Sequence, residues 1–263
     1  MAKKGVCHNK NDGVPVVLGG GASRGPGHSG LLDALDDARV LISMYIGISI
    51  GSIVGAFRTN NRTTEQIDDV FVSGLQKMWS VGGVLRALVP PVFQPLRLLG
   101  GGVLDLVPIM SDLVDEYGLT TQDNLYIVAY DLISRQVVVF SGHDYNLKLA
   151  LAASCAVPGM MRPVEVYYKG RRMLLVDGGV FHPHPGSLCA KPAIIGKLID
   201  TVGLNLVYTD REEDVICSVG KPFAPFFTSL SREKVTELHE YGYTQARDAL
   251  AVPLRRGLLP IAA

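Results

Sequence analysis

The sequence predicts an α/β fold of three layers, in which helices flank a central mixed, mostly parallel sheet. In the first quarter of the chain short apolar runs alternate with segments of helical periodicity, and antiparallel strand pairs follow later. Hydrophobic residues make up 48% of the 263 residues and charged residues only 19%, so a large core can form. We expect a flexible arm at residues 1–13, a principal domain at 14–208 and a C-terminal helical extension at 209–263 that packs on the same domain.

The first elements follow from the apolar pattern. Val14 to Leu18 is a short apolar run, typical of a buried strand, and it leads into a glycine-rich loop. Residues 28–38 carry leucine and alanine at helical spacing, which predicts a helix. Residues 40–46 form a second apolar run that stops at Gly47, so we expect a second strand there.

The rest of the chain mixes helices with paired strands. Thr63 with Gln66 three residues later has the pattern of a capping box, which predicts a helix through Met78. Lys169-Gly170 between two alternating runs indicates a hairpin. The other predicted elements are helices at 52–57, 106–117, 147–155 and 231–251 and strands at 125–130, 136–140, 164–168, 173–176 and 204–208.

Two interpretations compete for the glycine-rich loop. Gly25 to Gly30 has the G-x-G-x-x-G spacing of a dinucleotide-binding turn, whereas Gly19 to Gly21 could direct backbone N–H groups at an oxyanion. A dinucleotide site needs a carboxylate about 20 residues beyond its glycines to bind the ribose. No acidic residue lies between Asp37 and Glu65, so the oxyanion interpretation is favoured.

The end of the second strand carries the candidate nucleophile. Gly47-Ile48-Ser49-Ile50-Gly51 is a G-x-S-x-G sequence between an apolar strand and a helical segment, the context in which this motif holds a serine on a sharp turn. Gly47 and Gly51 leave out Cβ atoms that would clash there. The N-terminus of the following helix favours negative charge beside Ser49.

A nucleophilic serine needs a base, and the histidines are weak candidates for it. Ser49, Asp177 and His239 match the Ser–Asp–His order of α/β-hydrolases, but Ser49 comes after only two strands, too early for that fold. His239 lies in a polar helix where we expect a surface position. His182 and His184 lie closer to Asp177, but flanking prolines favour ordinary loop residues.

Three features together resemble the patatin-like phospholipase family: a glycine-rich loop after the first strand, an early G-x-S-x-G and a late Asp-Gly-Gly at 177–179. The segments YIVAYDL, ASCAVPG and VDGGV also follow in the family's order, so the likeness runs from about residue 14 to about 208. Several positions depart from the family pattern. Ala22 stands where a third glycine is usual, Pro183 stands where asparagine is frequent, and Ile48 and Ile50 flank the serine where small residues are usual.

The resemblance implies a Ser–Asp dyad without histidine, with Ser49 as nucleophile and Asp177 as its base. It also implies an oxyanion hole formed by the N–H groups of Gly20, Gly21 and Ala22, and it requires neither a cofactor nor a metal. Partial burial of the aspartate would strengthen it as a base. The supporting motif residues are Arg24, Gly25, Gly47, Gly51, Gly178 and Gly179.

The leading functional hypothesis is therefore a metal-independent lipid acyl hydrolase of the phospholipase A type, acting on phospholipids or other acyl lipids through an acyl-serine. A transacylase differs only in passing the acyl group to an alcohol instead of water. A second class is a catalytically idle patatin-like module that binds lipid or a partner; the presence of both Ser49 and Asp177 argues against it.

Composition adds expectations about partners and location. A net charge of zero and a pI near 7 argue against nucleic-acid binding. The polar N-terminus and the absence of a long apolar run indicate a cytoplasmic protein, and the four separated cysteines indicate reduced thiols. The acid-free stretch at 70–104 and the C-terminal AVPLRRGLLPIAA combine apolar and basic residues, so we expect one or both to make peripheral contact with anionic membranes.

Overall fold

The computed structural model describes residues 12–75, 104–181, 185–198, 212–222, 224 and 228–262. Several sequence-based expectations lie outside the described residues: the arm before Asp12, Cys7, most of the acid-free stretch, residues His182 to His184, and the strand expected at 204–208. Among the helices of the described ranges, none has the length and apolar character needed to cross a membrane.

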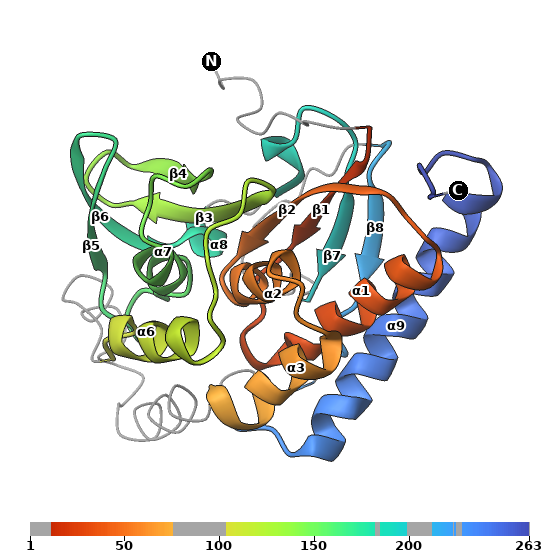
Figure 1. Ribbon diagram of the computed structural model, residues 1–263, viewed down its shortest axis with the longest axis horizontal. Helices are drawn as coiled ribbons and strands as arrows, with labels where there is room; N and C mark the ends of the chain where they lie inside the picture. Colours follow the sequence, from red (N-terminus) through yellow and green to blue (C-terminus); the bar gives the residue numbers. More distant parts are fainter. Residues whose placement is uncertain are drawn as a thin grey trace.

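An eight-stranded mixed sheet organises the molecule (Figure 1), in the order β5-β6-β3-β2-β1-β7-β8 with β4 also paired to β3. The pairs that join β3, β2, β1, β7 and β8 are parallel, whereas β4, β6 and β5 are joined by antiparallel pairs. The strands are β1 (Val14–Leu18), β2 (Ile42–Ile48), β3 (Leu125–Asp131), β4 (Gln136–Phe140), β5 (Val164–Tyr168), β6 (Arg171–Asp177), β7 (Ile194–Lys197) and β8 (Val215–Ser218). A mixed central sheet with flanking helices confirms the predicted fold class.

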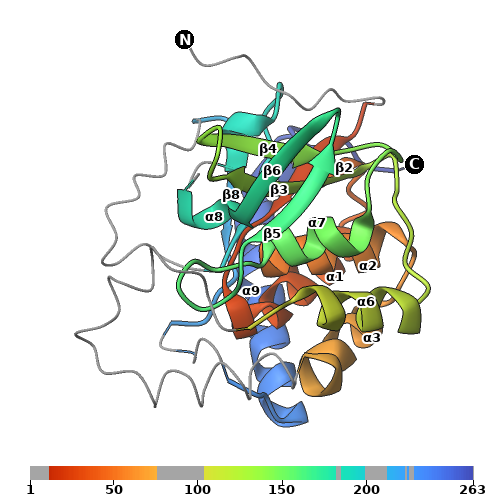
Figure 2. The same cartoon turned by 90° about the vertical axis from the view of Figure 1, so that its left-hand side faces the viewer.

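The larger helices gather on one face of this sheet (Figure 2), where they form the larger of two hydrophobic clusters. Two short elements, α8 and a 3-10 helix at Pro185–Leu188, follow β6 toward the other face, where Leu188 packs in the smaller cluster with Ile46 and Ile48. The α-helices are α1 (Pro26–Asp37), α2 (Ile50–Thr59), α3 (Thr64–Asp69), α6 (Val107–Glu116), α7 (Leu147–Ser154), α8 (Gly178–Phe181) and α9 (Arg232–Arg255). A 3-10 turn at Ala22–Arg24 precedes α1, and a π-helical turn at Val70–Gly74 follows α3.

Most predicted elements are present, with shifts at their ends. The capping box of Thr63 and Gln66 is confirmed, but α3 ends at Asp69 and continues as the π-helical turn. The second strand runs through Gly47, where a stop was expected, because both Gly47 and Ile48 pair with β3. The strands β7 and β8 were not predicted: each has four residues, too few for a periodic pattern to stand out.

The G-x-G-x-x-G spacing serves helix packing. A Cβ on Gly27 would lie 2.3 Å from the carbonyl oxygen of Val219, and one on Gly30 would lie 2.1 Å from that of His239 in α9. From the other side, a Cβ on Gly242 would lie 2.3 Å from the Gly27 carbonyl oxygen. These glycines let α1 and α9 approach with their backbones nearly in contact, so helix packing explains their spacing.

Strand pairing brings two distant parts of the chain together at one point of the sheet. The strand β4 occupies one edge of β3 along Ile127–Asp131. The strand β2, which pairs Ile48 with Val128, and the strand β6, which pairs Asp177 with Ala129, must therefore share the other edge. Because β2 runs parallel to β3 and β6 runs antiparallel to it, their carboxyl ends meet.

Candidate active site

Ser49 stands on the turn between β2 and α2 with φ 53° and ψ −127°, a conformation that non-glycine residues rarely adopt. Its N–H donates to the Ser154 hydroxyl at 2.9 Å, and that hydroxyl donates to the Val128 carbonyl at 2.7 Å. The Ser49 carbonyl in turn accepts from the Ser52 hydroxyl at 2.6 Å. The strained backbone is thus fixed on both sides by buried hydrogen bonds.

The two glycines that flank the serine motif are required by close backbone approach. A Cβ on Gly47 would lie 2.3 Å from Ser52 Cα, inside the turn itself. One on Gly51 would lie 2.0 Å from the carbonyl oxygen of Leu18, at the end of β1. The motif therefore fits the turn against β1 as well as shaping it.

Asp177, the last residue of β6, accepts a hydrogen bond from the Ser49 hydroxyl. The carboxylate is 3% exposed and also accepts the Gly179 N–H at 2.8 Å. Burial raises the pKa of Asp177 to about 6, although the hydrogen bonds from Ser49 and from the N–H groups of Gly179 and Val180 favour the charged form. The carboxylate therefore binds a proton far more readily than an exposed aspartate does.

The glycine-rich loop lies against the same serine. A Cβ on Gly20 would be 3.2 Å from Ser49 Cβ, so only a glycine fits there without a shift. The Gly19 N–H is already used, since it donates to the Gly196 carbonyl of β7 at 3.1 Å. Within the described part of the chain, the N–H groups of Gly20, Gly21 and Ala22 have no acceptor. Ala22 has φ 51°, the left-handed region that a glycine would adopt more easily.

The residues after this loop hold it in place. The Arg24 guanidinium donates to the Ala224 carbonyl at 2.7 and 3.0 Å and to the Leu198 carbonyl at 3.3 Å. A Cβ on Gly25 would lie 2.0 Å from the Phe71 ring, so the π-helical turn after α3 packs directly on the loop. Arg24 thus links the loop by hydrogen bonds to two segments that are distant in sequence, at Leu198 and at Ala224.

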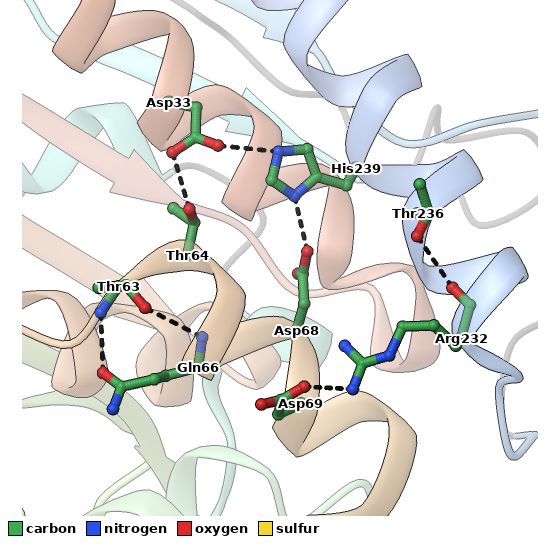
Figure 3. A network of polar contacts seen from close by, with 9 residues as sticks. All are labelled: Asp33, Thr63, Thr64, Gln66, Asp68, Asp69, Arg232, Thr236 and His239. Carbon is green, nitrogen blue, oxygen red and sulfur yellow. Dashed lines mark hydrogen bonds and ion pairs between the residues drawn. The ribbon is translucent and has the colours of Figure 1, made fainter.

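His239 follows Ser49 and Asp177 in the chain order of a Ser–Asp–His triad, but it contacts Asp33 and Asp68 in a separate cluster (Figure 3). Its Nε2 lies 2.9 Å from Asp33 Oδ2 in α1, and its Nδ1 lies 2.6 Å from Asp68 Oδ2 in α3. The expected surface position holds only in part, because the side chain is 20% exposed. Burial disfavours the charged imidazole, but the hydrogen bonds and charges of Asp68 and Asp33 outweigh it and raise the pKa of His239. The residue joins three helices.

Three residues near Ser49 were not assigned a role from the sequence. Ser154 fixes the Ser49 N–H, and Cys155 lies beside the Ser49 and Ser52 hydroxyls as a buried thiol whose pKa burial raises. His28 lies beneath the glycine-rich loop. The segment ASCAVPG, which contains Ser154 and Cys155, was a usable signal, since its position in the family's order marks it as part of the site.

Comparison with solved structures first defines the class of fold. The chain superimposes on the crystal structure of VipD from Legionella pneumophila with a TM-score of 0.52 and 12% identity, covering 93% of this chain and 68% of that one. At this identity the likeness concerns the fold.

The sequence comparisons then give the family. The model of the patatin-like phospholipase family matches residues 16–187, and the chain belongs to this family. An uncharacterized NTE family protein of Mycobacterium bovis is 31% identical over 176 residues, which is 65% of this chain and 44% of that protein. The neuropathy target esterase sws of Drosophila grimshawi is 27% identical over 177 residues, 66% of this chain and 11% of the esterase. The chain thus spans less than half the length of these curated relatives.

Proposed function

We propose that the chain is a lipid acyl hydrolase of the phospholipase A type, which cleaves fatty-acyl esters through an acyl-serine at Ser49 with Asp177 as the base. The observation that carries this proposal is the hydrogen bond from the Ser49 hydroxyl to a buried carboxylate with a raised pKa. A lipid ester as substrate is supported by the family, which is named for phospholipases, and by the Drosophila relative, which is named an esterase.

In the first half-reaction Ser49 Oγ attacks the ester carbonyl carbon while its proton passes to the Asp177 carboxylate. The carbonyl π electrons move onto oxygen, and the resulting oxyanion accepts hydrogen bonds from the N–H groups of Gly20, Gly21 and Ala22. Each such donor contributes on the order of 3 kcal/mol to the transition state. The intermediate then collapses, the C–O bond to the alcohol breaks, and the leaving alkoxide takes the proton from Asp177.

The second half-reaction repeats these steps with water as the nucleophile. Water gives a proton to Asp177 and attacks the acyl-serine carbonyl. Collapse of the new oxyanion breaks the bond to Ser49 Oγ, which recovers the proton, and the fatty acid leaves. The 2.8 Å bond from the Gly179 N–H holds one carboxylate oxygen, Oδ1, throughout both half-reactions.

The test uses the full chain with a fluorophosphonate probe and with phosphatidylcholine vesicles. The wild type should become labelled at Ser49 and release fatty acid, and Ser49→Ala should do neither. Mass spectrometry of the products separates the variants of the proposal, because free fatty acid indicates hydrolysis and a newly acylated alcohol indicates acyl transfer. A wild type that neither labels nor turns over would overturn the proposal in favour of an idle lipid-binding module.

A further inference from the structure

His28 is a buried side chain of α1 that the proposed reaction does not use. It is 0% exposed, and its Nε2 lies 2.8 Å from the Gly19 carbonyl oxygen. Its other nitrogen, Nδ1, has no partner among the described residues. The missing side chain of Gly196 makes room for the ring, since a Cβ there would lie 2.9 Å from Nδ1.

The protonation state of this ring follows from its surroundings. Burial lowers the pKa of His28 to about 4, although its hydrogen bond to Gly19 favours the charged form. The ring is therefore neutral at neutral pH and carries one N–H. A carbonyl oxygen can only accept, so the proton must be on Nε2, and His28 donates to Gly19.

The acceptor of this bond is joined rigidly to an oxyanion-hole candidate. The carbonyl of Gly19 and the N–H of Gly20 belong to one planar trans peptide, in which they point in opposite directions. Gly20 is the loop residue that lies against Ser49. The Gly19 N–H is bound to the Gly196 carbonyl and the Gly19 carbonyl is bound to His28. These two hydrogen bonds hold the peptide between Gly19 and Gly20 and so fix the direction of the Gly20 N–H.

We propose that His28 is a positioning residue, which orients the Gly20 N–H toward the oxyanion by donating a hydrogen bond to the Gly19 carbonyl. The inference rests on the proposed function, because it assigns a role in the same reaction. The bond is made behind the loop, away from the substrate, so His28 acts on the transition state and leaves substrate binding alone. Its loss should therefore appear in kcat and not in KM.

The matched pair of variants is His28→Leu, which removes the donor, and His28→Gln, whose side-chain amide N–H can replace Nε2. On a soluble p-nitrophenyl ester, kcat of His28→Leu should fall about 10- to 100-fold, a part of the effect of losing an oxyanion donor, with KM within about threefold. The glutamine variant should recover most of kcat. Thermal unfolding of both proteins shows whether they are folded to the same extent.

A second variant keeps the imidazole but displaces it, in case the leucine protein does not fold. Gly196→Ala places a Cβ 2.7 Å from Leu31 Cδ2 and 2.9 Å from His28 Nδ1, so it crowds both side chains, and it should also lower kcat at unchanged KM. In the wild type, ¹⁵N NMR of the histidine rings should show a neutral ring protonated at Nε2 at neutral pH. That measurement needs no turnover, so it tests the hydrogen bond even if the hydrolase proposal fails.

Two results overturn the inference while leaving the hydrolase intact. One is a folded His28→Leu protein with wild-type kcat. The other is an equal loss of kcat in the leucine and glutamine variants that follows their loss of stability, which would mean that the ring only fills space. If the wild type itself fails to label at Ser49, the hydrolase proposal fails first and the role of His28 in catalysis fails with it.

Discussion

Asp177 and Asp68 are both buried aspartates, in two regions of the molecule that treat a carboxylate differently. At the carboxyl ends of β2 and β6, Asp177 has only neutral partners, the Ser49 hydroxyl and two backbone N–H groups. In the α1–α3–α9 region, Asp68 and Asp33 lie on either side of His239, a group that can carry a positive charge (Figure 3). A positive charge on His239 offsets the charges of Asp68 and Asp33, whereas no positive group among the described residues offsets the charge of Asp177.

The difference teaches what each region is suited to do. A buried carboxylate without a countercharge is destabilised as an anion, so it is ready to take a proton from a neighbouring hydroxyl. Burial raises the pKa of Asp68 as well, but the hydrogen bond and charge of His239 oppose that rise, and the pair links α3 to α9. We therefore expect substitutions at the carboxyl ends of β2 and β6 to cost activity and substitutions among α1, α3 and α9 to cost stability.

The largest expected effect is at Ser49. Ser49→Ala should lower ester turnover at least about a thousandfold, because it removes the attacking atom. Ser49→Gly should be equally inactive but more stable than the alanine protein by about 1 kcal/mol, because glycine adopts the positive φ at this turn without strain. Turnover assays and urea unfolding check both. Substantial turnover in either variant would show that the active site does not lie at the carboxyl ends of β2 and β6.

Asp177→Asn should also remove nearly all activity, yet it should stabilise the protein. The pKa of Asp177 rises from 3.8 to about 6 on folding, so the wild type loses stability as pH increases through that window. The shift corresponds to a cost of about 3 kcal/mol that is fully present above it. Asparagine carries no charge, so the variant should gain stability over the wild type by about 1 to 3 kcal/mol at about pH 8 and by little at about pH 4.

Urea unfolding of the wild type and of Asp177→Asn across pH measures this difference. In the wild type, kcat/KM should decline on the acid side with an apparent pKa of about 6, where the base becomes protonated. An active asparagine variant would show that Asp177 is not the base, and a stability advantage that is the same at all pH values would show that folding does not raise the pKa of Asp177.

His239→Leu is the matched change in the helical region. It removes the imidazole that bonds both Asp33 and Asp68 and should lower the free energy of unfolding by about 1 to 2 kcal/mol, allowing for partial exposure of the site. Because folding raises the pKa of His239, its contribution is fully present below the unfolded pKa of 6.5 and is lost as pH rises through the folded value. Unfolding at acid and alkaline pH checks this trend. A folded variant with kcat reduced tenfold would instead place His239 in the active site.

The smallest effect is expected at the C-terminal segment, one of the two segments expected to contact membranes. The Leu41 N–H donates to the Pro260 carbonyl at 2.8 Å, so this segment lies where β2 begins. Ser49 lies beyond the other end of β2, about 25 Å away at the rise of a strand. Replacing the exposed Leu258 and Ile261 with serine should change turnover on anionic vesicles less than about twofold. If turnover on vesicles fell much further while turnover of a soluble ester stayed unchanged, the C-terminal segment would be assigned to membrane docking.

What the sequence determined by itself is what depends on neighbouring residues. The turn at Ser49 follows from the glycines on either side of it, the start of α3 from Thr63 and Gln66, and the hairpin at Lys169-Gly170 from a glycine that accepts positive φ. In the capping box, in the hairpin and in the contact of Gly47 with Ser52 the interacting groups lie within a few residues, so spacing alone carries the information. The contact that requires Gly51, with the Leu18 carbonyl of β1, is tertiary.

Only the tertiary structure decided how distant segments meet. The contact of Ser49 with Asp177 depends on β2 and β6 sharing one edge of β3, and the use of Gly27, Gly30 and Gly242 depends on how α1 crosses α9. Likewise, His239 pairs with Asp33 and Asp68 because three helices converge. A one-dimensional pattern records which groups are available; strand pairing and helix packing determine which of them are brought within hydrogen-bonding distance.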